Sequence, residues 1–203
     1  MRKKTEARRQ AIIDAAVEVF GEVGYEQASM AEIAARTGVY KQTLYGYFES
    51  KEDLFVEVMV GSAADEIKAA FALLNTSTPI RDTLTSFGKH YLIAVLKPKL
   101  LAMRRLATYE GGRSSLGAQF YERGPKVGWT MVTEFLQDSI RLGHLRKCNA
   151  PVATAHLRAL YEAELAEPCL LDVPVDTSSR NITKVINRAV DVFMAAYGNA
   201  DAN

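Results

Sequence analysis

Residues 29–48, "SMAEIAARTGVYKQTLYGYF", decide the fold of the first part of the chain. Ser29 followed three residues later by Glu32 forms a capping box, in which each side chain bonds the backbone N–H of the other residue, so a helix begins here. Gly38 allows a tight turn that a β-branched residue could not make. A second short helix is expected over about 40–47. The stretch therefore predicts a helix-turn-helix.

The second helix of this motif combines aromatic and polar side chains. Val39 and Leu44 are expected to face inward, which leaves the hydroxyl, amide and ammonium groups outside. Glutamine can bond bidentately to adenine, lysine can reach guanine or a phosphate, and the threonine methyl can meet thymine. Tyrosine hydroxyls commonly bond phosphate oxygens, which fixes register. With the Ser29 cap included, the predicted DNA-binding residues are Ser29, Tyr40, Lys41, Gln42, Thr43, Tyr45, Tyr47 and Lys51.

An alternative interpretation stays open at this point. Helix-turn-helix geometry also occurs as plain scaffold, in which Tyr45 or Tyr47 would be a core residue with a hydrated hydroxyl. The net charge of +1 over 203 residues gives no global basic field, so DNA would have to meet a local patch. Lys51 would place a cation at the positive start of the next helix, which suits an anion contact. A basic N-terminal arm could add phosphate or minor-groove contacts through Arg2, Lys3, Lys4, Arg8 and Arg9.

The remainder of the chain shows helical periodicity and no strand alternation, which predicts an all-α protein of about nine helices. One helix is expected over 115–142, interrupted near Gly124-Pro125, and another over about 149–171. Residues 1–49 are predicted to form a helix-turn-helix DNA-binding domain, and residues 50–203 a helical effector-binding and dimerisation domain. A unit under 50 residues buries little core alone, so it should lean on the helix that starts at Lys51.

The amino-acid composition limits the cellular compartments in which the protein is expected. The apolar share of 48% and the charged share of 24% are ordinary for a folded, soluble protein. Two cysteines cannot form a disulfide framework, no apolar run approaches the roughly 18–20 residues of a membrane span, and no secretory signal is visible. A cytoplasmic protein without a membrane partner is expected.

Three segments resemble a known family. "SMAEIAARTGVYKQTLYGYFESKEDLF" (29–55) resembles the DNA-binding signature of the TetR family of bacterial transcriptional regulators, and "AIIDAAVEVFGEVGYEQAS" (11–29) is similar to the helix before it. "RRLATYEGGRSSLGAQFYER" (104–123) resembles the regulatory domain of AcrR-like or AefR-like members. Tyr40 departs from the pattern, because a small capping residue such as serine is more usual there. Gln42 fills another place that is often small, which favours it as a base reader.

The resemblance implies a homodimer whose last two helices form a four-helix interface with those of a second copy. A dimer would place two reading helices about 34–36 Å apart, so its operator should be palindromic. The alternative is that these apolar stripes pack only inside one chain. The predicted interface residues are Leu157, Leu160 and Leu165 on one helix, and Ile186, Val190, Phe193 and Tyr197 on the other, with Cys169 and Ile182 on the same stripes.

The resemblance also implies a ligand cavity in the larger domain. A few polar groups within apolar faces would orient the ligand, although His90 could be a core histidine and both glutamates could be solvated. We expect a repressor released by a small, largely apolar ligand through a population shift, with the helix from Lys51 as the lever. The predicted lining residues are Phe87, His90, Tyr91, Met103, Tyr109, Glu110, Trp129, Val132, Tyr161 and Glu164.

Two other classes of protein are alternatives. An enzyme is disfavoured because "EGGRSS" (110–115) lacks the lysine and spacing of a P-loop and no G-x-S-x-G elbow exists. The spacing of His144, Cys148 and His156 matches no zinc pattern, so neither a metal nor another cofactor is expected. An architectural DNA binder without a ligand is the second alternative. A long second domain rich in methionine and aromatics argues against it.

Overall fold

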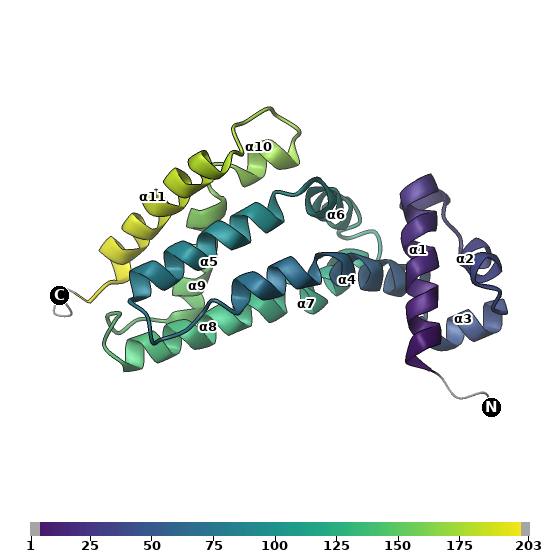
Figure 1. The fold of residues 1–203 in the computed structure, drawn as a ribbon, viewed down its shortest axis with the longest axis horizontal. Helices are drawn as coiled ribbons and strands as arrows, with labels where there is room; N and C mark the ends of the chain where they lie inside the picture. Colours follow the sequence, from purple (N-terminus) through teal and green to yellow (C-terminus); the bar gives the residue numbers. More distant parts are fainter. Residues whose placement is uncertain (1–4, 200–203) are drawn as a thin grey trace. The chain divides into compact units, whose positions relative to one another are not determined.

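The computed structural model describes residues 5–199, apart from the side chains of 62–65, and this part of the chain holds eleven α-helices (Figure 1). The predicted all-α class is therefore confirmed. The helices are α1 (Glu6–Gln27), α2 (Met30–Thr37), α3 (Lys41–Tyr47), α4 (Lys51–Phe71), α5 (Ile80–Val95), α6 (Pro98–Tyr109), α7 (Leu116–Arg123), α8 (Pro125–Arg141), α9 (Ala150–Glu162), α10 (Ala166–Leu170) and α11 (Ser179–Tyr197).

Two of the predicted helices are each divided in the structure. The one expected over 115–142 becomes α7 and α8, with the break at the predicted place, because Gly124 has φ −115° and ψ −92° and Pro125 begins a new helix. The one expected over 149–171 becomes α9 and α10, since the chain leaves helical geometry at Leu165, where φ is −121°. These two breaks account for eleven helices where about nine were expected.

The chain forms two compact units that do not follow the predicted boundary after residue 49. One unit comprises Met1–Ser62 together with Ala107–Arg123, and the other comprises Ala63–Leu106 together with Gly124–Asn203. The first half of α4 and all of α7 therefore belong with the helix-turn-helix. No helix in the described part of the chain is long and apolar enough to cross a membrane.

The first unit is held by an aromatic core and by ion pairs between its helices. The ring of Phe55 on α4 lies 4.7 Å from the rings of both Phe20 and Tyr25 on α1, measured between centroids. Arg36 on α2 donates to both carboxylate oxygens of Glu22 on α1, at 2.7 and 2.8 Å. This bidentate pair fixes α2 against α1, and so sets the platform on which α3 stands.

The second unit is a helical bundle in which α5 and α9 both pack against α11, and α9 also packs against α8 (Figure 1). The helices approach closely where glycine replaces a side chain. A Cβ atom at Gly88 of α5 would lie 2.8 Å from Cε1 of Tyr161 on α9, and one at Gly128 of α8 would lie 2.4 Å from the Phe71 ring. Both glycines allow aromatic rings to fill the space between helices.

Candidate DNA-reading surface and effector site

The turn of the helix-turn-helix forms as the sequence predicts. Ser29 Oγ accepts a hydrogen bond from the Glu32 backbone N–H at 3.2 Å. Gly38 ends α2 in the left-handed region with φ 66°, where glycine is unstrained. Leu44 is completely buried, and Val39 is half-buried. This packing fixes which side of α3 faces solvent.

The solvent face of α3 carries most of the predicted DNA contacts. Tyr40 is 86% exposed and Tyr45 43% exposed, and Lys41 and Gln42 are exposed as well. The Lys41 ammonium lies 5.9 Å from the centroid of the Tyr45 ring. Thr43 is half-buried beside them. These five side chains form what we call the reading face, and they are those that could enter a major groove together.

Tyr40 begins α3 without capping it. Its backbone is extended (φ −68°, ψ 142°), and among the described residues its side chain makes no capping hydrogen bond. A tyrosine hydroxyl cannot reach back to its own helix as a serine can, so the ring projects into solvent. The departure from the family pattern thus supplies an exposed phenol at the start of the reading helix.

Two other residues that were predicted to contact DNA form hydrogen bonds within the first unit. The Tyr47 hydroxyl accepts a hydrogen bond from the Thr5 backbone N–H at 2.9 Å, which ties the end of α3 to the start of α1. The Lys51 ammonium donates to the carbonyl oxygens of Tyr25, at 2.8 Å, and Glu26, at 3.4 Å, and lies 4.3 Å from the Tyr25 ring centroid. Lys51 thus has partners within the protein, and its phosphate contact stays a prediction. A cation near the negative C-terminus of α1 is favourable.

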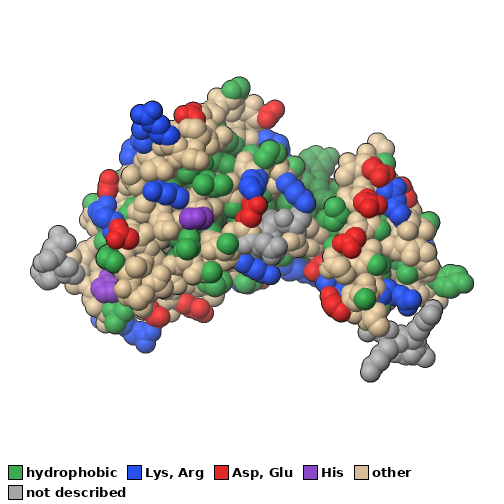
Figure 2. All heavy atoms as spheres, viewed as in Figure 1, with side chains coloured by type: hydrophobic (Ala, Val, Ile, Leu, Met, Phe, Trp, Pro, Cys, Tyr) green, Lys and Arg blue, Asp and Glu red, His purple; other side chains and the backbone are tan. Residues whose placement is uncertain are grey.

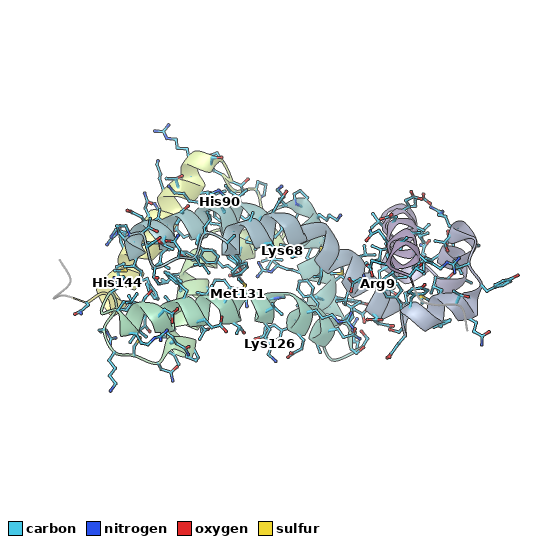
Figure 3. The ribbon with its side chains drawn as sticks, turned by 60° about the horizontal axis from the view of Figure 1, so that its bottom comes forward. Arg9, Lys68, His90, Lys126, Met131 and His144 are labelled. Carbon is cyan, nitrogen blue, oxygen red and sulfur yellow. The ribbon has the colours of Figure 1, made fainter. Side chains whose placement is uncertain are left out.

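One residue of the predicted basic arm, Arg9, also contacts the protein itself. Arg9 forms an ion pair of 2.7 Å with Glu57 and lies 5.3 Å from the centroid of the Phe48 ring, so it contacts the protein's own α4 (Figure 3). The predicted arm residues Arg2, Lys3 and Lys4 lie outside the described residues. On the face shown in Figure 2, basic and acidic side chains are interspersed and form no single basic field. DNA recognition therefore depends on local contacts.

Five aromatic side chains form a buried cluster in the second unit, which we call the aromatic cluster: Phe71, Phe87, Tyr91, Trp129 and Tyr161. The rings of Tyr91 and Trp129 are 5.0 Å apart between centroids and meet edge to face. Tyr161 donates from its hydroxyl to the Leu84 carbonyl at 2.7 Å, so its one polar atom is satisfied. Four of the predicted lining residues belong to this cluster. Met103 and Val132 are buried in the same unit.

A charged residue that was not among the predicted site residues, Glu162, borders this cluster. Glu162 accepts hydrogen bonds from the Tyr91 hydroxyl at 2.5 Å and from Arg104 at 2.6 Å, and Arg158 contacts it at 3.2 Å. Burial opposes ionisation of Glu162, but Arg104, the Tyr91 hydroxyl and Arg158 together lower its pKa. Burial and the neighbouring Glu162 charge raise the pKa of Tyr91 above its ordinary range. The four-residue spacing of Arg158 and Glu162 on one helix was the available signal.

The two predicted polar residues of the second unit lie outside the cluster. His90 is exposed on α5, and its Nδ1 lies 2.9 Å from the Ser86 carbonyl (Figure 3). Glu164 is exposed and pairs with Arg188 on α11 at 2.6 and 3.0 Å. The expectation that these residues are polar groups within apolar faces is wrong, because His90 is on the solvent side of α5 and Glu164 is exposed in the turn between α9 and α10.

The remaining two predicted lining residues belong to the first unit. Tyr109 is 58% exposed, and the Arg113 guanidinium lies 4.1 Å from its ring centroid. Glu110 is buried in the unit that contains the helix-turn-helix, where its charge helps to raise the pKa of Tyr25, although burial of Tyr25 is the larger cause. Neither residue takes part in the aromatic cluster.

A groove of about 430 Å³ opens on the second unit beside this cluster. Phe71 belongs to both: it lines the groove, and its ring lies 6.4 Å from Trp129 between centroids. Met131 on α8, labelled in Figure 3, is 44% exposed at the same groove. The other lining residues are Leu74, Asn75, Thr76, Ser77, Glu134, Phe135 and Asp138. The volume is within the range of small-molecule sites.

The predicted dimer residues pack inside one chain. Leu157, Leu165, Ile186, Val190, Phe193 and Tyr197 are all buried, and Leu160 is half-buried. The apolar stripe of α11 packs against α5 and α9. The exposed sides of these helices carry a different set: Val152, Ala155, Ala159 and Ala163 on and just after α9, and Val192, Ala195 and Ala196 on α11.

A helix-turn-helix with an exposed reading face, joined to a helical unit with a groove and a buried aromatic cluster, defines a DNA-binding transcriptional regulator. Residues 12–58 match the family described as "Bacterial regulatory proteins, tetR family", and residues 82–199 match "AefR-like transcriptional repressor, C-terminal domain". The chain therefore belongs to the TetR family, with an AefR-like C-terminal domain. TetR-family regulators are not enzymes.

Similar proteins agree with this assignment. A TetR-family regulator from Mesorhizobium loti is 26% identical with a TM-score of 0.81, covering 96% of this chain and all of that one. The "Flavonoid-responsive Regulator FrrA" is 28% identical with a TM-score of 0.79, covering 97% of this chain and all of that one. The "Fatty acid metabolism regulator protein" of Bacillus subtilis is 43% identical over 56 residues, which is 28% of this chain and 29% of that protein. The chain spans about a third of the length of such curated relatives.

Proposed function

We propose that this regulator is a homodimeric repressor that binds a palindromic operator and is released by a small, largely apolar ligand. The observation that carries the proposal is the exposed reading face of α3, since three other predicted DNA contacts, Tyr47, Lys51 and Arg9, have partners within the protein. Tyr40, Lys41, Gln42 and Tyr45 are exposed together, whereas Lys51 is held by backbone carbonyls.

Roles within the reading face follow from side-chain chemistry. Gln42 suits bidentate contact with adenine, and Lys41 and Thr43 suit guanine and the thymine methyl. Tyr40 and Tyr45 suit phosphate oxygens on either side, which would set the register of α3 in the groove. Ser29 and Tyr47 keep supporting roles through their contacts with Glu32 and Thr5.

The dimer is proposed through the exposed sides of α9 and α11. Small side chains at Ala155, Ala159, Ala195 and Ala196 would let two copies approach closely, and Val192, 54% exposed, would be covered. A carboxylate introduced by Ala159→Glu should yield monomers in sedimentation velocity and abolish operator binding. Ala102→Glu, on the exposed side of α6, is the control and should remain dimeric.

The effector site is proposed at the aromatic cluster, entered from the groove by displacement of Phe71. The rings would hold the apolar body of the ligand, and the Glu162–Tyr91–Arg104 group would supply polar contacts. The similar regulator FrrA is described as flavonoid-responsive, which supports an aromatic effector. Trp129 is the single tryptophan of the chain, so its fluorescence should report occupancy directly.

The experiment is selection of bound duplexes from a random pool at about 150 mM salt, which weakens non-specific binding. A two-fold symmetric motif supports the dimeric regulator. Binding without any preference would favour a ligand-independent architectural protein instead. The selected duplex then serves to screen aromatic compounds for release, with Trp129 emission as the independent signal of binding. A compound that changes the emission and leaves operator affinity unchanged at saturation contradicts the proposed release.

A further inference from the structure

The DNA-reading unit is completed by a segment from much later in the sequence. Residues 107–123, which contain α7, are compact with the helix-turn-helix rather than with the bundle. Leu116 at the start of α7 is completely buried.

The C-terminal end of α7 is joined to α4 by ion pairs of Arg123. Arg123 Nη2 lies 2.6 Å from Asp53 Oδ1, and Arg123 Nη1 lies 4.0 Å from Glu57 Oε2. The other oxygen of Glu57 pairs with Arg9 at 2.7 Å, and the Arg9 guanidinium lies against the ring of Phe48. Phe48 is the residue that ends α3. A continuous series of contacts therefore connects α7 to the end of the reading helix.

A second contact runs through the same carboxylate. Asp53 uses its other oxygen, Oδ2, to accept a hydrogen bond from the Glu49 backbone N–H at 3.2 Å, directly after α3. Its own N–H donates to the Ser50 hydroxyl at 3.0 Å. Arg123 thus holds a side chain that also orders the turn between α3 and α4.

The other end of α7 lies directly on the backbone of α6. A Cβ atom at Gly117 would be 2.7 Å from the Ala107 carbonyl oxygen, so only glycine permits this approach. α7 is therefore held near both ends, at Gly117 by this close approach and at Arg123 by ion pairs.

We propose that Arg123 is a positioning residue for the reading helix. Through Asp53 it orders the turn that follows α3, and through Glu57 and Arg9 it supports Phe48 at the end of α3. The inference rests on the proposed function only where operator affinity is the readout.

The test compares Arg123→Gln with Arg123→Lys, which keeps the cation, and with Arg141→Gln, which removes an arginine from an ion pair within α8. Backbone hydrogen exchange is measured over 41–48, and affinity is measured for the selected duplex and for random duplex. Arg123→Gln should speed exchange over 41–48 and weaken only the selected duplex, each about two- to fivefold, as expected for one partly exposed ion pair. Arg123→Lys should restore most of both, and Arg141→Gln should change neither.

The outcomes separate this inference from the proposed function. Faster exchange confined to 113–123, or equal weakening of both duplexes, overturns the positioning role, because Arg123 would then only tether α7. Faster exchange over 41–48 with no selected duplex available supports the positioning and counts against the operator.

Discussion

Replacing Gly88 by alanine should destabilise the bundle, and the magnitude can be worked from the packing. The new Cβ would lie 2.8 Å from Cε1 and 2.9 Å from Cζ of Tyr161, and 3.0 Å from a methyl of Ile186. Carbon atoms prefer about 3.5–4.0 Å, so the ring must retreat by roughly 0.7 Å. Tyr161 is completely buried, and its retreat stretches the 2.7 Å hydrogen bond to Leu84.

Three contributions decide the net effect. Overpacking costs about 1–3 kcal/mol and a weakened hydrogen bond about 1 kcal/mol, while alanine is favoured over glycine in a helix by about 1 kcal/mol. Gly88→Ala should therefore lower the free energy of unfolding by about 1–3 kcal/mol and Tm by about 2–12 °C for a chain of this size. The assay is thermal unfolding followed by circular dichroism, at fixed protomer concentration.

Gly61→Ala provides the matched control. Gly61 is exposed on α4, and a Cβ atom added there would meet no neighbouring group within 4 Å in the described part of the chain. The same substitution should there raise the free energy of unfolding by about 0.4–1 kcal/mol. If Gly61→Ala and Gly88→Ala raise the free energy of unfolding by the same amount, the packing argument for Tyr161 is refuted.

Three further predictions concern the sites. Gln42→Ala should cost about 1–3 kcal/mol at one base position and relax the preference there, measured by repeating the duplex selection. Lys51→Met should lower the free energy of unfolding by about 1–2 kcal/mol, because it removes the bonds to the end of α1, while the ratio of operator to random-duplex affinity stays unchanged. Because the folded-state pKa of Glu162 is lowered, its stabilising contribution is present at neutral pH and is lost as the pH falls below about 4.5. Denaturant titrations should show that Glu162→Gln is about 1–3 kcal/mol less stable at pH 7 and loses less on acidification.

Local signals in the sequence were sufficient for the DNA-reading part. The Ser29 cap, the left-handed Gly38 and the buried Leu44 are all short-range features, and together they fix which side of α3 faces solvent. The internal partners of Lys51 had no such local signal. Its position at a helix start is visible in the sequence, but the carbonyls of Tyr25 and Glu26 that it bonds come from α1, which the chain brings near only on folding.

The packing of the larger unit was harder to predict, because helical periodicity identifies an apolar stripe but not the helix against which that stripe packs. The stripe of α11 containing Ile186 and Phe193 is compatible with either an internal core or a dimer, and the internal helices α5 and α9 take it. Glu162 follows a buried tyrosine and looks like any helical glutamate. Its importance comes from Arg104, 58 residues away, and such pairings have no local signal.

The packing of α7 with the helix-turn-helix has a consequence for recombination between such regulators. A DNA-reading module made of residues 107–123 as well as the first 62 cannot be transferred by one crossover. A hybrid that joins the first 62 residues to the bundle of a relative would pair Asp53 and Glu57 with a foreign α7. Such hybrids should bind their operator at full affinity only when the recipient supplies a cationic side chain, best an arginine, in the place of Arg123. Recombination between relatives is therefore expected to preserve these three positions as a linked set, although two of them lie far from the third in the gene.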